Sequence, residues 1–332
     1  MGDIATSYTI AILGAGSWGT AIAIHLANNG YRVIMWGRNA AHIKTLQEQR
    51  CNEQYLSKIK FPENLHVTSD LVVCELALDT MIAVPSHAFT AIINKIKPPT
   101  NGISWLTKGM KPDDNQLFSQ MLIEKFGANY PLSIISGPSF AKEVAQGLPT
   151  ALTLAGNNVF YQSRIQRLLH HNNLRIYLSH DMIGVQLSGT MKNVIAIACG
   201  ISDGLGYGAN ARAALITRGL VEMRRLGHSM AAINATFNGL AGVGDLVLTC
   251  TDNQSRNRRF GLLLGQGWDI EHAEKEIQQV IEGKNNAYQI YNLSKMYGLD
   301  LPICEQIYLI LKNYITPQQA VTNLMSRVAN ME

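Results

Sequence analysis

The sequence predicts an α/β N-terminal domain with a mostly parallel sheet, followed by an all-α C-terminal domain. Two observations lead to this prediction. Short apolar runs alternate with helical patterns up to about residue 180, which is typical of a parallel sheet covered by helices on both faces. From Asp181 onward, strand patterns largely stop and helical segments follow one another. We therefore expect two domains, residues 1–188 and residues 189–332.

The first predicted strand leads into a glycine-rich turn. Residues 9–13 form an apolar, partly β-branched run, and Gly14, Gly16 and Gly19 follow with the spacing G-x-G-x-x-G before a helical pattern begins. In this arrangement the glycines permit a tight turn, a close approach to a pyrophosphate and close packing of the helix on the strand. Free N–H groups at the helix N-terminus would bind the phosphates. The pattern predicts a Rossmann-like, dinucleotide-binding domain; the alternative is an ordinary strand-to-helix turn.

The second predicted strand, residues 31–36, is followed by Arg38 rather than by an acidic residue. NAD-specific sites usually place a carboxylate here, where it accepts hydrogen bonds from the ribose hydroxyls. A guanidinium instead suits a 2′-phosphate, because it can bind one with two parallel hydrogen bonds. We therefore expect NADP to be accepted and preferred to NAD. The alternative is a solvated surface arginine.

The remaining elements of the N-terminal domain follow the same alternation. Further strands are predicted at residues 65–68, 79–85, 103–107, 132–136, 151–155 and 174–178, and helices at about 86–96, 115–126 and 139–146. Ligands of parallel sheets bind beyond the carboxyl ends of the strands. The candidate binding edge therefore includes Pro85, Lys108, Gly137 and Ser139.

In the C-terminal domain, helices are predicted at about residues 190–202, 209–227, 254–266, 285–297, 302–313 and 317–328. The first of these places Lys192 and Asn193 at the head of an otherwise apolar helix. Apolar surroundings disfavour the charged form of a lysine and lower its pKa toward the range useful for acid–base chemistry. The alternative is a helix-end lysine that extends into solvent.

Two polar segments of the C-terminal domain are further candidates. Asp245 stands among glycines and aliphatic residues, where it could cap a helix or hold a catalytic lysine or a substrate hydroxyl. Ser255–Asn257 presents hydroxyl, guanidinium and amide groups at a predicted helix start, which is an anion-binding set. The alternative, a basic solvated helix face, fits Arg258 and Arg259 better than it fits Arg256.

Composition excludes several classes of protein. Apolar residues make up 47% of the chain and charged residues 16%, and the basic residues behind the net charge of +4 are scattered, so nucleic acid is not indicated. No apolar run approaches the ~20 residues that span a bilayer, and the N-terminus lacks the regions of a signal peptide. The five cysteines include no C-x-x-C pair, as expected of reduced thiols. We expect a cytoplasmic protein with no stable membrane anchor and no metal site.

Beyond these features, the sequence resembles the NAD(P)-dependent glycerol-3-phosphate dehydrogenases of the bacterial type. The matching blocks run along nearly the whole chain and are GAGSWGTA, WGRN, VPSHAF, LTKG, SGPSFAKE, MKNVIAIACGISDGLGYGANARAAL, TRGLVEM, GLAGVGDLVLTC, SRNRRFG, VIEGKNNA and LPICEQIY. The resemblance implies an NAD(P)-dependent oxidoreductase acting on a CH–OH group. The reaction would be reversible hydride transfer between NAD(P)H and dihydroxyacetone phosphate, giving sn-glycerol 3-phosphate for glycerophospholipid synthesis. It also implies a homodimer.

The same resemblance assigns roles to individual residues. It implies that Lys192 is the proton-accepting lysine. Besides the three glycines of the turn, the implied cofactor contacts are Ser17, Trp18, Arg38, Lys108, Ala141, Arg256, Val280 and Glu282. The implied substrate contacts are Lys108, Gly137, Ser139, Lys192, Asp245, Ser255, Arg256 and Asn257.

Two alternative functions are weighed against this one. The first is a β-hydroxyacid dehydrogenase of the same two-domain build, and the second is a non-catalytic protein that senses dinucleotides. A carboxylate substrate would not call for the phosphate-binding segment, and a non-catalytic relative would not need a lysine together with an acidic neighbour. The residues that discriminate against both are Lys108, Lys192, Asp245 and Arg256.

Overall fold

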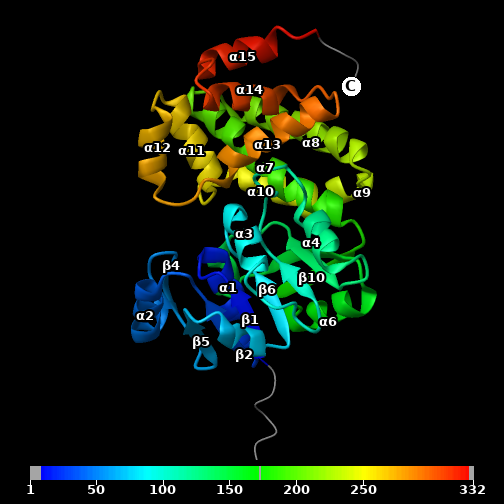
Figure 1. The fold of residues 1–332 in the computed structure, drawn as a ribbon. Coiled ribbons are helices and arrows are strands. Elements are labelled where there is room, and N and C mark those ends of the chain that lie inside the picture. The colour runs from blue at the N-terminus through cyan, green and yellow to red at the C-terminus, as the bar shows by residue number, and fades with distance from the viewer. Residues whose placement is uncertain (1–8, 172, 329–332) are drawn as a thin grey trace, which may run out of the picture. The chain divides into compact units, whose positions relative to one another are not determined.

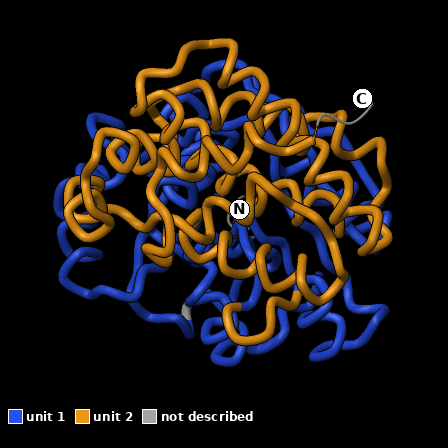
Figure 2. Tube along the Cα trace, turned by 90° about the horizontal axis from the view of Figure 1, so that it is seen from above, with its two compact units in different colours: residues 1–111, 117–182 blue, residues 112–116, 183–332 orange. Residues whose placement is uncertain are grey.

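The computed structural model describes residues 9–171 and 173–328, and Figure 1 shows their helices and strands. The chain divides into two compact units, coloured separately in Figure 2. Unit 1 comprises residues up to Lys111 together with Leu117–Met182, and unit 2 comprises Pro112–Gln116 and the residues from Ile183 onward. The boundary expected after residue 188 lies inside one continuous helix, α7 (Met182–Gly204).

Unit 1 is built on an eight-stranded sheet with the order β10-β9-β8-β7-β6-β1-β2-β5. Neighbouring strands are parallel except β8 and β9, which are antiparallel, so the prediction of a mostly parallel sheet is confirmed. Each strand of this sheet overlaps a segment predicted from the sequence. The strands are β1 (Thr9–Leu13), β2 (Arg32–Trp36), β5 (Leu65–Thr68), β6 (Asp79–Ile82), β7 (Ile103–Trp105), β8 (Leu132–Ser136), β9 (Thr150–Gly156) and β10 (Leu174–Ser179).

Unit 1 also contains elements that the sequence analysis did not predict. These are helix α2 (Ala40–Gln49), helix α6 (Val159–Leu169), the 3₁₀ turn η2 (Val72–Leu76) and a hairpin of β3 (Cys51–Asn52) and β4 (Leu56–Lys60). In α2 the buried residues are Ile43 and Leu46, so its apolar stripe is too narrow to stand out in the sequence. The other helices are α1 (Ser17–Asn28), α3 (Ser86–Ile93), α4 (Phe118–Phe126) and α5 (Ala141–Ala145).

The described part of unit 2 beyond residue 182 is helical, which confirms the predicted all-α C-terminal domain. Its long helices are α7 (Met182–Gly204), α8 (Ala209–Ser229), α11 (Arg256–Gly265), α13 (Glu282–Met296), α14 (Pro302–Leu311) and α15 (Pro317–Met325). Shorter elements that were not predicted are α9 (Asn234–Phe237), the π-helical turn η3 (Leu240–Gly244), α10 (Asp245–Thr251) and α12 (Ile270–Ile277).

Helix α7 corrects the expectation that Lys192 stands at a helix head. The helix begins at Met182, ten residues before Lys192. Residues 184–189 are helical and buried, but glycines and polar residues interrupt their apolar pattern, so the sequence analysis did not include them in the helix. By length and composition α7 could cross a membrane, yet 89% of its most apolar window is buried within the structure. We therefore describe α7 as a core helix of unit 2.

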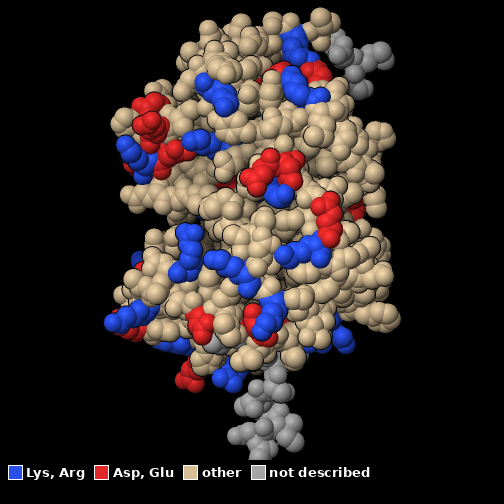
Figure 3. Space-filling view, in the orientation of Figure 1, with Lys and Arg blue, Asp and Glu red and all other residues tan. Residues whose placement is uncertain are grey.

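The surface carries both signs of charge. On the face drawn in Figure 3, Lys and Arg side chains are interspersed with Asp and Glu among uncharged residues. Neither sign forms a continuous field on this face, in keeping with the scattered basic residues of the sequence.

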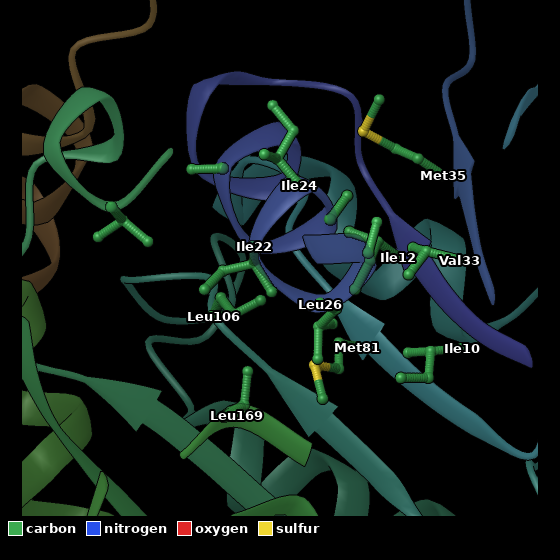
Figure 4. Close-up of a cluster of buried hydrophobic side chains, with 14 of the residues drawn as sticks. Ile10, Ile12, Ile22, Ile24, Leu26, Val33, Met35, Met81, Leu106 and Leu169 are labelled. Carbon is green, nitrogen blue, oxygen red and sulfur yellow. The ribbon is translucent and has the colours of Figure 1, made fainter. Parts of the chain in front are cut away.

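A hydrophobic cluster supports the first strand and the first helix of unit 1 (Figure 4). Its completely buried side chains include Ile10 and Ile12 of β1 and Ile22 and Leu26 of α1. Burying one such side chain stabilises a fold by roughly 1.5–3 kcal/mol. The cluster thereby fixes α1 against the sheet and holds the turn between β1 and α1 in place.

Candidate functional site

The glycine-rich turn between β1 and α1 has a separate steric requirement at each glycine. Gly14 has a φ of +133°, and a Cβ there would lie 2.5 Å from the carbonyl oxygen of Ala83. A Cβ on Gly19 would lie 2.0 Å from the carbonyl oxygen of Gly14, so only glycine lets α1 begin this close to the turn. A Cβ on Gly16 would meet nothing within 4 Å. The space beside Gly16 is therefore open to a ligand.

The start of α1 suits the phosphates of a dinucleotide. Gly16 is the N-cap and provides no side-chain hydrogen bond, and the first turn contains no acidic residue. Its N–H groups can therefore bind an anion, which the helix dipole also favours. Ser17 and Trp18 are half-buried, and the buried Nε1 of Trp18 has no hydrogen-bond partner among the residues described. The unpaired Nε1 of Trp18 and the N–H groups at the start of α1 could therefore donate hydrogen bonds to a polar ligand at this turn.

Asn52, which the sequence analysis missed, supports the turn from the β3–β4 hairpin. Its side chain is fully buried, and Nδ2 donates to the carbonyl oxygen of Ala15 at 3.0 Å and to Oγ1 of Thr20 at 2.8 Å. These two bonds tie the turn to the first full turn of α1. No local pattern identifies Asn52, because its partners lie more than thirty residues earlier in the chain.

Arg38 lies in the loop after β2 and is exposed. Within residues 9–171 and 173–328 its guanidinium makes no hydrogen bond or ion pair. The next residue, Asn39, caps α2, since its Oδ1 accepts hydrogen bonds from the N–H groups of Ala41 and His42 at 3.0 and 3.2 Å. The cap fixes the path of the loop and leaves the Arg38 side chain available to an external anion.

The other predicted residues of unit 1 follow neighbouring strands of the sheet. Lys108 is half-buried three residues after β7, and Gly137 directly follows β8 with a φ of +145°. The hydroxyl of Ser139 donates to the carbonyl oxygen of Gly137 at 3.0 Å, and Ala141 begins α5. Because β1, β6, β7 and β8 are parallel neighbours, these residues and the glycine-rich turn lie at the same edge of the sheet.

In unit 2, Lys192 is buried in a polar cluster. The residue is 5% exposed, and its Nζ donates to Oδ1 of Asp245 and, at 2.9 Å, to Oγ1 of Thr249. Asp245 is 1% exposed and forms an ion pair with the lysine. The alternative of a lysine extending into solvent is therefore wrong. The helix-capping alternative for Asp245 is also wrong, because the residue is the first of α10, whose N-cap is Gly244.

Thr249 is a functional candidate that the sequence analysis missed. Its hydroxyl donates to the backbone carbonyl of Asp245 at 2.6 Å and accepts from the ammonium of Lys192. It thus fixes the lysine relative to α10. The available signal was its position four residues after Asp245, which places both side chains on one face of a helix.

The segment Ser255–Asn257 begins α11, as predicted. Ser255 is the N-cap, and its hydroxyl accepts a hydrogen bond from the N–H of Arg258 at 3.2 Å. Arg256 is the first residue of the helix and is half-buried. Arg258 does not lie on a solvated face: it is 7% exposed, and its guanidinium pairs with Asp203. Asp203 lies 55 residues earlier in the chain, so no local sequence pattern indicates this pairing.

A chain of buried amides orients Asn257. The N–H of Gly283 donates to Oδ1 of Asn257 at 2.9 Å, and Nδ2 of Asn257 donates to Oδ1 of Asn193 at 2.9 Å. Nδ2 of Asn193 then donates to Oδ1 of Asn286 at 3.1 Å, and Asn286 donates to Gln289 at 3.2 Å. All donors point the same way, so the orientation of each amide is fixed. The chain links α7, α11 and α13.

The last predicted positions lie where α13 begins. Val280 is 41% exposed and precedes the helix, and Glu282 is its first residue. In the part of the chain that the structure describes, no group of three or more His, Cys, Asp or Glu side chains could hold a metal ion. The five cysteines are free and buried.

Comparisons with known proteins match both units. The family model for the N-terminus of NAD-dependent glycerol-3-phosphate dehydrogenase matches residues 9–161, and the model for its C-terminus matches residues 181–322. The chain is 61% identical over 325 residues to a glycerol-3-phosphate dehydrogenase (NAD(P)+) of Legionella pneumophila strain Paris, covering 98% of this chain and 99% of that protein. A relative with the same name from Shewanella sp. strain MR-4 is 49% identical over 331 residues, covering 98% of each chain.

A solved structure agrees with these sequence matches. The crystal structure of glycerol-3-phosphate dehydrogenase from Coxiella burnetii superposes with a TM-score of 0.93 at 46% identity. The alignment covers 97% of this chain and all of that one.

Proposed function

Since this chain belongs to the family of NAD-dependent glycerol-3-phosphate dehydrogenases, we propose how its own residues carry out the reaction of that family. The protein is an NAD(P)-dependent oxidoreductase acting on a CH–OH group. It interconverts dihydroxyacetone phosphate and sn-glycerol 3-phosphate. When bound, the nicotinamide cofactor supplies or accepts the hydride. The residues of the chain bind the substrate, hold the proton and stabilise charge.

The buried cluster of Lys192, Asp245 and Thr249 is the observation that carries the assignment of the catalytic residue. As the ketone is reduced, negative charge builds on its oxygen. The ammonium of Lys192 stabilises that charge and donates the proton, and in the reverse direction the amine takes the hydroxyl proton. Asp245 and Thr249 hold Nζ in place, which keeps the donor in one geometry.

The phosphate of the substrate is assigned to the start of α11. Arg256 supplies a guanidinium, Ser255 a hydroxyl and Asn257 an amide, and the helix dipole adds a favourable potential. Within the protein, Oδ1 of Asn257 accepts one hydrogen bond and Nδ2 donates one. The second N–H of Nδ2 is therefore the group that Asn257 can offer to a phosphate oxygen. Further proposed substrate contacts, carried over from the family, are Lys108, Gly137 and Ser139.

The residues of unit 1 that would hold the cofactor fit that role. The open space beside Gly16 and the free N–H groups of α1 suit the pyrophosphate, and exposed Arg38 suits a 2′-phosphate. NADPH is therefore proposed as the preferred cofactor. Other proposed contacts are Ser17, Trp18, Lys108 and Ala141 of unit 1 and Arg256, Val280 and Glu282 of unit 2.

We further propose the cellular setting from the family resemblance. The protein acts as a cytoplasmic homodimer without a stable membrane anchor, and its product enters glycerophospholipid synthesis. One assay separates this function from the two alternatives. NADPH oxidation is measured with dihydroxyacetone phosphate, dihydroxyacetone and a β-keto acid side by side. Preference for the β-keto acid would favour a β-hydroxyacid dehydrogenase, and no turnover of any of them would favour a non-catalytic protein.

The substitution Lys192→Met tests the catalytic assignment. Methionine keeps much of the bulk of the lysine stem and removes the charge and the proton, so kcat should fall at least ~10²-fold, the lower end for loss of an acid–base group. NADPH affinity, measured by fluorescence titration, should stay nearly unchanged. Lys275→Met is the matched control, since Lys275 is exposed on α12. Near-normal turnover by the Lys192 variant would reject the assignment and make Lys108 the next candidate.

A further inference from the structure

A hollow of suitable size for a small ligand lies entirely within unit 2. Its volume is about 590 Å³, within the range of known ligand pockets. Two arginines and a histidine line it together with apolar side chains, and no acidic side chain does. The lining residues are Val221, Arg224, Arg225, His228, Ser229, Ala232, Asn234, Phe237 and Leu299. None of them belongs to the residues assigned to the cofactor or the substrate.

The basic groups of this hollow share one face of α8. Val221, Arg224, Arg225 and His228 follow the spacing i, i+3, i+4 and i+7, so their side chains point to the same side. Phe237 is completely buried beneath them. The hollow therefore combines a cationic wall with an apolar floor.

The two guanidinium groups are held in place by uncharged acceptors. Nε of Arg224 donates to Oδ1 of Asn234 at 2.8 Å, and Nη1 of Arg225 donates to the backbone carbonyl of Asp300. The Asp300 carboxylate itself pairs with Arg327. Within the residues described, neither Nη1 nor Nη2 of Arg224 has a hydrogen-bond partner. The positive charge of Arg224 is thus oriented by the protein but not neutralised by it.

We propose that this hollow binds a phosphate monoester that carries an apolar group. Two guanidinium groups suit a doubly charged phosphate, and the partly exposed apolar side chains of Val221, Ala232 and Leu299 suit an apolar substituent. The C-terminal end of the α8 dipole opposes an anion. That effect is smaller than the contribution of one charge-assisted hydrogen bond.

Occupancy of the hollow is coupled to the catalytic cluster through the chain itself. Asn234 and Phe237 line the hollow, and the turn η3 runs from just beyond them to Asp245, the partner of Lys192. A Cβ on Gly242, within that turn, would lie 2.2 Å from the carbonyl oxygen of Phe237, so the turn packs directly on the backbone of Phe237. A ligand that shifts Phe237 therefore shifts the turn and Asp245. Only this coupling rests on the proposed function; the binding does not.

Equilibrium titration with phenyl phosphate tests the binding. The wild-type protein should bind two equivalents, one at the substrate site and one here. Arg224→Ala should weaken one of them by about tenfold or more, the loss of one charge-assisted contact. Arg218→Ala, an exposed arginine on the same helix outside the hollow, should keep both. Two unchanged equivalents in the Arg224 variant, or equal losses in both variants, would overturn the proposal.

Three further measurements complete the test. Arg256→Ala should remove the other equivalent; if it does not, the proposed substrate site fails while the hollow stands. Phosphatidate-containing vesicles, tested by co-sedimentation, distinguish a lipid headgroup from a soluble ester as the source of the phosphate. Phenyl phosphate that competes at the substrate site raises only KM. A change in kcat with phenyl phosphate therefore demonstrates the coupling, provided that Arg224→Ala abolishes the change and Arg218→Ala keeps it. An unchanged kcat refutes it.

Discussion

At the residue scale, the proposed chemistry depends on buried polar side chains that are paired with one another. A buried ammonium without a counter-charge would be strongly destabilising, and the ion pair of Lys192 with Asp245 removes that penalty. Arg38 is exposed and Arg256 is half-buried, and both are proposed to meet charges that belong to ligands. Substitutions at these two arginines should therefore change ligand selectivity more than stability.

Arg38→Ala should weaken the use of NADPH by about 1–3 kcal/mol in kcat/KM, the range for a charge-assisted contact, and leave NADH little changed. The reason is that only NADPH carries the 2′-phosphate. Steady-state kinetics with both cofactors measure the effect. Arg32→Ala, at the exposed start of β2, is the control and should change neither. Equal losses for NADPH and NADH would contradict the assignment of Arg38.

Arg256→Ala should abolish the preference for dihydroxyacetone phosphate over dihydroxyacetone, mainly by weakening the phosphorylated substrate. Its guanidinium is the charged group proposed to meet the phosphate. Arg259→Ala, three residues later on the same helix, should do far less. The ratio of kcat/KM for the two substrates is the measurement. Similar behaviour of the two variants would place the phosphate site elsewhere.

At the scale of elements, the glycines of the turn between β1 and α1 have different roles, one in packing and one in binding. Gly19 lies where two backbone segments touch, whereas Gly16 lies beside open space. Both residues are glycines of one sequence pattern, yet their surroundings give them different physical requirements. Alanine substitutions at the two positions should therefore have opposite consequences.

Gly16→Ala should leave the melting temperature nearly unchanged and weaken NADPH and NADH alike, by about tenfold or more, which corresponds to ~1.4 kcal/mol. Its φ of −84° is allowed to alanine, but the new methyl group would enter the space proposed for the pyrophosphate. Gly19→Ala should destabilise the fold by about 1–3 kcal/mol, because its Cβ meets backbone that cannot move aside. Thermal unfolding and fluorescence titration give both quantities. The same loss of stability in both variants would refute the distinction.

At the scale of the whole molecule, the stability of the helical unit includes one buried carboxyl group. Glu222 of α8 is 3% exposed, and its two oxygens accept hydrogen bonds from the N–H groups of Ile303 and Cys304 at 2.6 and 3.1 Å. It thus joins α8 to the start of α14. Burial raises the pKa of Glu222 to about 7, although the two N–H groups act in the opposite direction.

A raised pKa means that the folded protein holds this proton more tightly than the unfolded chain does. Stability should therefore fall as pH rises from about 4.5 to about 7, by about 3 kcal/mol from this group. Glu222→Gln should remove that slope, and Glu276→Gln, an exposed glutamate of α12, should keep it. Urea unfolding across this pH range measures the slope. A pH dependence that persists in Glu222→Gln would assign it to other groups.

Much of the fold is determined by local sequence. The strands of the large sheet and the longer helices follow from apolar periodicity, since each buries one continuous face or run. The turn at Gly14–Gly19 follows from its glycine spacing, because the tight packing there excludes other residues. A helix over about residues 254–266 was expected from its periodicity, and α11 begins within that range, with Ser255 as its N-cap.

The tertiary structure decided the surroundings of the polar residues. Lys192 meets Asp245 across 53 residues of sequence, Arg258 meets Asp203 across 55, and Asn257 meets Asn193 across 64. A periodic pattern records which face of an element is apolar, but it does not record which distant polar group will meet a given side chain. That pairing depends on how separate helices pack. For this reason the sequence identified the candidate residues, while packing determined that Lys192 is buried and paired and that Arg258 is withdrawn from solvent.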